Sequence, residues 1–213
     1  MNKINKTKRI LMRVLLLILL TFAMISITSC KSSPVDRLTD TLKVHFINVG
    51  QGDAILIQCD GKNMLIDAGS NDKGELVKAY LENEDVEKLD YVIGTHPHEG
   101  HIGGLDFIID NFEVGKVIMP KVTTNTKTYK DVIDSIKNKN LKIKEPKVGT
   151  SYSLGNASWQ IIAPNSSNYE SINNYSICIK LTYGYNSFLF TGDAEALSEA
   201  EMIKSGIDLS STY

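Results

Sequence analysis

The spacing of apolar residues alternates between two periods along the chain. In LKVHFINVG every second residue is apolar, so Leu42, Val44 and Phe46 fall on one face of a predicted strand. Two short apolar runs then flank Asp60 and Gly61, a pair that favours the tight turn of a hairpin. Five further runs are predicted strands, the last two forming a hairpin around Tyr183 and Gly184: residues 89–96, 115–120, 158–164, 175–184 and 186–193.

Three segments have helical spacing instead: residues 75–85, 129–136 and 194–206. Thr128 and Asp131 form a weak capping pair for the second segment, and Gly206 should end the third. Strands with helices inserted at intervals exclude a plain helical bundle or β-sandwich. The pattern therefore predicts a mixed α/β or α+β domain in which helices cover sheets.

The first 29 residues have the composition of a secretory signal. Five basic residues and no acidic one precede an apolar run from Val14 to Ile27, shorter than the roughly 20 residues of a stable membrane span. The run ends in ITSC, which resembles a bacterial lipobox with Cys30 as the lipidated residue; an ordinary cleaved signal is the alternative. We expect an extracytoplasmic protein, lipid-anchored to the bacterial cell membrane. Its parts are a signal (1–29), a lipidated cysteine and polar tether (30–41), and one domain (42–213).

Loss of the signal changes the charge balance. The chain has 23 basic and 25 acidic residues, and without the five basic residues of the signal the balance is 18 to 25, a net charge of −7. Such a global charge does not indicate a non-specific polyanion binder. Between Lys116 and Lys147, however, nine lysines stand against three acidic residues. This stretch predicts either a phosphate-binding surface or an ordinary solvated helix face.

Cysteine usage gives no sign of a thiolate metal site. Cys59 and Cys178 each lie in a strand-like apolar run, and the chain has no CxxC pair. Two buried free thiols and a disulfide between them both remain open.

Three of the four histidines crowd into THPHEGH. His96 and His98 are two positions apart, so in an extended segment their side chains point to the same side. His101 follows where the chain turns, and it can approach the same point from another direction. Because neutral imidazole suits zinc and similar transition metals, the cluster predicts a metal centre. The alternative is three histidines on a solvated loop.

Two carboxylates also follow predicted strands. Asp67 ends the strand of LIDAG, as either a turn residue or a support for a ligand histidine. Asp193 ends the strand of LFTGD, as either a metal ligand or the N-cap of a helix beginning at Ala194. The fourth histidine, His45, lies in an alternating strand and is predicted to be structural.

Four motifs in this order resemble the metallo-β-lactamase fold superfamily, and more narrowly the ComEC/Rec2-like hydrolase domain and its related lipoproteins: NVGQGD (48–53), LIDAG (65–69), HPHEGHIGG (96–104) and LFTGDAE (189–195). The resemblance implies an α+β, four-layer αββα sandwich of two sheets flanked by helices. It also implies a hydrolase that acts through a metal-activated water, with phosphodiester or nucleic-acid substrates outside the cell membrane.

The resemblance further implies a role for each motif residue. His96 and His98 would bind a first ion and His101 a second, with Asp193 bridging the two. Asp67 would support the cluster from behind, and the loop with Gln51 and Asp53 would lie close by. The implied cofactor is zinc, as one or two ions, with manganese as an alternative. No protein partner is predicted.

Two features depart from the family pattern. Gly100 occupies the position of an aspartate ligand, so no catalytic side chain is identified, and Glu99 is a poor substitute because neighbouring side chains of an extended segment point oppositely. The chain also stops at Tyr213, before a family segment that supplies another histidine. We therefore expect a truncated domain with part of a sheet unpaired. Two further hypotheses are a non-catalytic, metal-binding surface lipoprotein and a hydrolase of a small ester or lactam.

Overall fold

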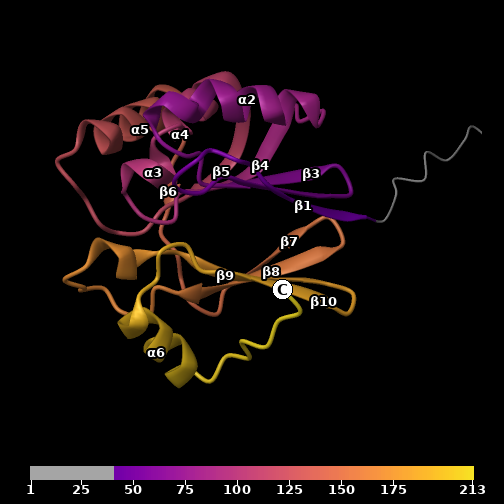
Figure 1. Cartoon of the computed structure of the whole chain (residues 1–213), viewed down its shortest axis with the longest axis vertical. Coiled ribbons are helices and arrows are strands. Elements are labelled where there is room, and N and C mark those ends of the chain that lie inside the picture. The colour runs from indigo at the N-terminus through magenta and orange to yellow at the C-terminus, as the bar shows by residue number, and fades with distance from the viewer. Residues whose placement is uncertain (1–40) are drawn as a thin grey trace, which may run out of the picture. The chain divides into compact units, whose positions relative to one another are not determined.

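The computed structural model describes residues 41–213, which form two β-sheets lying face to face with helices on both outer sides (Figure 1). This confirms the predicted four-layer α+β arrangement. The expected signal, the lipidated Cys30 and nearly all of the tether lie outside the described residues, and they stay predictions. No helix within residues 41–213 is both long and apolar enough to cross a membrane.

The first sheet has six strands in chain order: β1 (Leu42–Phe46), β2 (Ile55–Cys59), β3 (Lys62–Ile66), β4 (Lys88–Ile93), β5 (Glu113–Ile118) and β6 (Ile143–Lys144). β1 to β3 are antiparallel, and β3 to β6 are parallel. The turn between β2 and β3 has positive φ at Asp60 (50°) and Gly61 (71°), which confirms the predicted hairpin. The parallel strands need crossover connections, and helices supply them on the outer face.

The outer layer over the first sheet contains α2 (Gly74–Asn83), α4 (Leu105–Asn111) and α5 (Lys127–Asn138). The short helices η1 (Asn71–Lys73) and α3 (Glu99–Ile102) connect strands to this layer. The predicted cap of α5 is wrong. Thr126 is the N-cap and accepts a hydrogen bond from the Tyr129 backbone N–H at 3.3 Å. Thr128 lies inside the helix, where it donates to Asn71.

The second sheet is antiparallel, in the order β10-β9-β8-β7. Its strands are β7 (Ser151–Leu154), β8 (Ala157–Ala163), β9 (Cys178–Tyr183) and β10 (Asn186–Phe190), with η2 (Ile172–Tyr175) before β9 and α6 (Ala196–Lys204) on the outer face. The outer edge of β10 is partly paired: the backbone N–H groups of Thr212 and Tyr213 donate to the Ser187 carbonyl, and the N–H of Leu189 donates to Tyr213.

Alternating side chains of the first sheet fill two separate apolar layers. Leu56 and Leu65 face the helices, whereas Ile57 and Met64 face the second sheet and Trp159. A third layer lies between the second sheet and α6, and it includes Cys178. Cys59 belongs to the layer between the sheets, and both of these cysteines are buried free thiols. The disulfide alternative is therefore wrong for this structure.

Candidate metal centre

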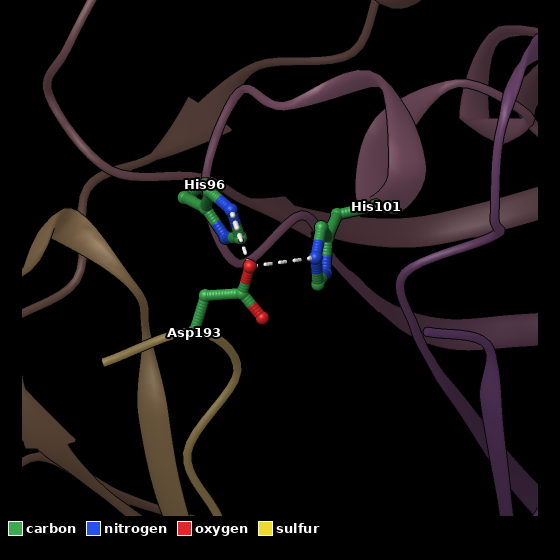
Figure 2. Close-up of side chains that lie close together, drawn as sticks. All are labelled: His96, His101 and Asp193. Carbon is green, nitrogen blue, oxygen red and sulfur yellow. Dashed lines mark ion pairs between the residues drawn. The ribbon is translucent and has the colours of Figure 1, made fainter. Parts of the chain in front are cut away.

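The motif residues meet at one end of the two sheets. Asp67 directly follows β3, and His96 lies shortly after β4. Because β3 and β4 are parallel neighbours, their carboxyl ends share an edge of the sheet. Asp193 reaches the same place from the loop after β10 in the second sheet (Figure 2). The site thus combines side chains from both sheets.

Asp67 lies at the base of the cluster and is completely buried. Its carboxylate accepts hydrogen bonds from the Thr95 backbone N–H at 2.8 Å and the Thr95 hydroxyl at 2.6 Å. A third contact joins its Oδ2 to His101 Nδ1 at 2.9 Å. Its backbone has a φ of 58°, so Asp67 is both a turn residue and a support for the histidines, and the two interpretations are compatible.

These hydrogen bonds determine which nitrogen of each ring is free. His101 Nδ1 donates to Asp67, which leaves Nε2 with its lone pair exposed to the site. The Thr95 hydroxyl proton goes to Asp67, so its oxygen accepts from His96 Nδ1 at 3.1 Å. His96 Nε2 is therefore also free to bind. Orientation of ligand imidazoles by a hydrogen bond to the other nitrogen is typical of metal sites.

The free nitrogens of His96 and His101 converge with Asp193 on one region (Figure 2). His96 Nε2 lies 3.0 Å from His98 Nδ1. Asp193 Oδ2 lies 3.3 Å from His101 Nε2 and 3.7 Å from His96 Nε2. Two tetrahedral ligands of zinc, each about 2.1 Å from the ion, are separated by roughly 3.4 Å. The donor atoms and their spacing therefore fit a divalent transition metal, with Asp193 between the His96 and His101 sides.

The surroundings shift the pKa values of His96 and His101 in opposite directions. Burial, followed by the charges of His101 and His98, lowers the pKa of His96 to about 3 from the ordinary 6.5, so this ring is neutral at physiological pH. Burial alone would lower the pKa of His101, but the hydrogen bond and charge of Asp67, with the charges of Asp193 and Asp53, outweigh it and raise the pKa. A neutral ring is the form that binds metal, so the shift at His96 favours this role, whereas a protonated His101 must release its proton when metal binds.

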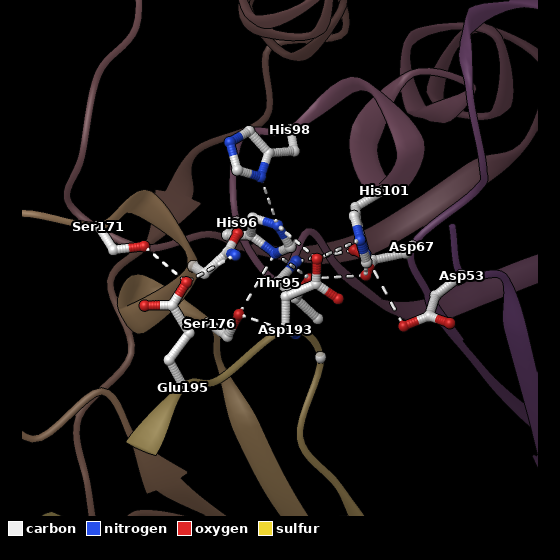
Figure 3. Close-up of polar contacts among 12 residues, drawn as sticks. Asp53, Asp67, Thr95, His96, His98, His101, Ser171, Ser176, Asp193 and Glu195 are labelled. Atoms are coloured by element: carbon white, nitrogen blue, oxygen red, sulfur yellow. Dashed lines mark hydrogen bonds and ion pairs between the residues drawn. The ribbon is translucent and has the colours of Figure 1, made fainter. Parts of the chain in front are cut away.

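Asp193 does not cap a helix. α6 begins at Ala196 with Glu195 in the N-cap position, so the alternative interpretation of Asp193 is wrong. The backbone N–H of Asp193 instead donates to Ser176 Oγ at 3.2 Å, and that hydroxyl lies 3.3 Å from His96 Nδ1. Ser176 thus joins the second sheet to the histidine cluster (Figure 3). No sequence signal marked Ser176 or Thr95, because serine and threonine are common in such positions.

The loop of NVGQGD lies directly against the histidine segment. Gln51, Asp53 and Gly100 line a cavity that also contains His98, His101 and Asp193. Asp53 Oδ2 lies 3.8 Å from His101 Nδ1. Partial burial, together with the charges of Asp67 and Asp193, raises the pKa of Asp53, and the charge of His101 offsets part of this effect.

Glu99 does not replace the missing aspartate. Its carboxylate accepts a hydrogen bond from Asn71 Nδ2 at 3.0 Å, outside the cluster. The predicted reason was wrong, because residues 99–102 form a helical turn and not an extended segment. His45 is structural as predicted: its Nδ1 lies 3.1 Å from the Tyr80 hydroxyl on α2.

Comparisons with known proteins agree with this geometry. A family model described as the metallo-beta-lactamase superfamily matches residues 47–162. The chain is 24% identical over 179 residues to ComE operon protein 3 of Bacillus subtilis, covering 76% of this chain and 23% of that protein. It is 30% identical over 164 residues to Recombination protein 2 of Haemophilus influenzae, covering 75% and 19% respectively. The chain thus spans about a fifth of the length of these relatives.

Solved structures show the same fold at low sequence identity. A mutant metallo-β-lactamase from Cronobacter sakazakii has a TM-score of 0.51 and 13% identity, over 69% of this chain and 60% of that one. The metallo-β-lactamase SMB-1 has a TM-score of 0.51 and 14% identity, over 76% and 69%.

Proposed function

Because the chain belongs to the metallo-β-lactamase superfamily, with ComEC/Rec2-like proteins among its relatives, we propose that it is a metal-dependent hydrolase of phosphodiester or nucleic-acid substrates. One observation carries the proposal. His96 Nε2 and His101 Nε2 lie beside the Asp193 carboxylate, and His98 Nδ1 lies next to His96 Nε2. Asp67 orients the His101 ring, and Thr95 orients the His96 ring. Zinc suits this mixture of imidazole and carboxylate donors best, and manganese is the alternative.

The residues of the cluster would have different roles in metal binding. His96 and His98 would hold a first ion and His101 a second, and Asp193 would serve both. Asp67 and Thr95 keep the ring nitrogens pointed into the site, so little reorganisation is needed when metal binds. A bound divalent ion supplies Lewis acidity and lowers the pKa of water to about 7, which makes a nucleophile available at neutral pH. The cavity beside Gln51 and Asp53 leaves the site open to substrate.

The lysine-rich stretch gives the substrate proposal modest support. On α5, Lys127 pairs with Asp131 at 2.6 Å and Lys137 with Asp134 at 3.6 Å. Lys116 and Lys144 lie over the ring of Tyr152, with nitrogens 5.7 Å and 5.0 Å from its centre. Because several of these charges have local partners, we assign the phosphate chemistry to the metal centre and only a secondary attraction to the lysines.

The proposed location rests on the sequence of the first 30 residues. A lipid on Cys30 would place the hydrolase outside the bacterial cell membrane. Labelled palmitate should be incorporated into the wild-type chain and not into Cys30→Ser. Incorporation into both would contradict the anchor at Cys30 without affecting the proposed chemistry.

The activity is tested on the purified full chain with zinc or manganese added. We expect cleavage of bis(p-nitrophenyl) phosphate and of single-stranded DNA, and we expect His96→Ala to reduce both by more than about 100-fold, since mutation of even a supporting group costs up to that much. His45→Gln is the matched control, because this histidine contacts Tyr80 and not the cluster. Cleavage of a β-lactam reporter without phosphodiester cleavage would contradict the proposed substrate class.

Gly100 favours one second candidate function, a surface domain that binds metal without catalysis. The family position for a carboxylate holds no side chain here. Stoichiometric metal binding with no hydrolysis of any of these substrates would support that candidate over the hydrolase.

A further inference from the structure

We propose that Asp53 supplies the carboxylate ligand that the histidine segment lacks at Gly100. In this assignment Asp53 binds the second ion together with His101 and Asp193. The inference rests on the metal binding proposed above, and it extends the ligand set to a residue outside the histidine segment.

The direction in which position 100 faces supports this assignment. A Cβ added to Gly100 would lie 3.5 Å from the Cα of Gly52, at ordinary contact distance. A side chain at position 100 would therefore extend toward the 50–53 loop. Asp53, the neighbour of Gly52, already places a carboxylate in the cavity that Gly100 lines. The loop thus supplies a carboxylate to this cavity, whereas position 100 supplies none.

The 50–53 loop is tightly fixed against the histidine segment at Gly100. The Asp53 backbone N–H donates to the Gly100 carbonyl at 3.2 Å, and the Gly69 N–H donates to the Asp53 carbonyl at 2.8 Å. Gly52 has a φ of 90°, and a Cβ at this position would lie only 1.8 Å from the Gly100 carbonyl oxygen. Only glycine permits so close an approach, so Gly52 lets the loop contact the histidine segment and position Asp53.

The exposure and position of the Asp53 carboxylate also support the assignment. Asp53 is 43% exposed, and its carboxylate lies 3.8 Å from His101 Nδ1, too far for a hydrogen bond. In Figure 3 its carboxylate and that of Asp193 lie on the two sides of the His101 ring, and both residues line the same cavity. In this assignment the exposed carboxylate turns toward His101 Nε2 when the second ion binds. Asp67 cannot serve instead, because it is buried and already accepts three contacts.

The test is a metal titration of the full chain by calorimetry, with zinc and with manganese, and with metal content measured by elemental analysis. Four variants are compared with the wild type: Asp53→Asn, Gly100→Asp, the double variant, and Asp110→Asn as a control. Asp110 is an exposed carboxylate on α4, away from the cavity. Circular dichroism confirms that each variant is folded before titration.

We expect two ions per wild-type chain. Asp53→Asn should keep the first ion and weaken the second by more than about 100-fold, beyond the usual loss for a residue that only supports a ligand. Gly100→Asp should bind the second ion at least as tightly as the wild type. In the double variant the carboxylate introduced at position 100 would replace the missing ligand and restore the second ion, and the control should behave as the wild type.

Three results would overturn the inference. If Asp53→Asn binds both ions as the wild type does, Asp53 is not a ligand, while the proposed hydrolase stands. If the double variant fails to restore the second ion although Gly100→Asp binds it, Asp53 acts by holding the loop and not as a ligand. If neither the wild type nor Gly100→Asp binds any ion, both this inference and the proposed function fail.

Discussion

The buried base of the candidate metal centre and its open rim differ in burial and in hydrogen bonding. At the base, Asp67, Thr95 and His96 are essentially without solvent exposure and are linked by short hydrogen bonds. At the rim, Asp193 and Asp53 are 44% and 43% exposed and have longer contacts to the histidines. The base fixes the direction of the His96 and His101 rings, whereas we expect the rim to determine how many ions bind. Substitutions in the two regions should therefore have different consequences.

The largest effect is expected at the base. Asp67→Asn removes a buried charge that holds His101 and accepts from Thr95, and breaking such a buried pair costs about 3–5 kcal/mol. The free energy of unfolding, measured by urea denaturation of the metal-free chain, should fall by about this amount. Metal binding should also be lost. An exposed carboxylate, Asp110, gives the control variant Asp110→Asn, which should change stability by less than about 0.5 kcal/mol. Equal stabilities for the two variants would show that the base is not a structural support.

A pH titration of the metal-free chain examines the base in a second way. His96 has a folded-state pKa of about 3 against 6.5 when unfolded, so between these values the unfolded state binds more protons. The stability that depends on a neutral His96 is fully present above pH 6.5. The free energy of unfolding should fall by on the order of 3 kcal/mol on acidification to pH 4. The raised pKa of His101 acts oppositely, because its stabilisation is complete below pH 6.5 and disappears as pH rises through the folded pKa.

His96→Gln isolates the first of these effects. Between pH 7 and pH 4 its free energy of unfolding should fall less steeply than that of the wild type, in urea denaturation of metal-free samples. Parallel curves for the two chains would mean that His96 is not held neutral by its burial.

The rim should respond in metal affinity and not in stability. Asp193→Asn keeps the shape of the side chain and its backbone bond to Ser176, so the free energy of unfolding of the metal-free chain should change by less than about 0.5 kcal/mol. Zinc affinity, measured by calorimetry, should fall by more than about 100-fold, because the carboxylate contacts both histidine sides. A large loss of stability with unchanged affinity would reverse the distinction between rim and base.

The smallest effect is expected on α5, outside both regions. Charge reversal of Lys127, Lys130 and Lys137 should weaken binding of single-stranded DNA by a few-fold and reduce its salt dependence. Lys88→Glu is the control, since this lysine lies at the amino end of β4, opposite the metal centre. Unchanged DNA affinity in the triple variant would exclude a role for this helix in substrate binding.

Sequence predicted the parts of the centre that have chemical signatures. The spacing of His96, His98 and His101 identified the cluster, and the positions of Asp67 and Asp193 after apolar runs placed them near it. The same reasoning missed Thr95 and Ser176. The Thr95 hydroxyl accepts from His96 because it donates to Asp67 at the end of the neighbouring strand, and Ser176 contacts His96 from the second sheet, so neither role has a local sequence signal. The cap at Thr126 was missed because Thr128 has an equally suitable local sequence, and burial against Asn71 decided between them.

For the fold too, the elements with local sequence signals were predicted and those without them were missed. Alternation and turn chemistry identified β1 and the β2–β3 hairpin, since these signals are local. The helix α4 was not predicted, and the short strands β6 and β7 were not predicted either. β6 has two residues and β7 has four, too few for a clear alternation of apolar and polar positions. They are strands because neighbouring strands pair with them.

The most direct test of the metal centre is an anomalous difference map from crystals of the chain grown with zinc. We predict a peak about 2.0–2.2 Å from His96 Nε2, His98 Nδ1 and the Asp193 carboxylate, and a second peak beside His101 Nε2. The rings of His96 and His101 should keep their contacts to Thr95 and Asp67. Crystals that contain zinc elsewhere, with no peak between the histidines and Asp193, would contradict the account.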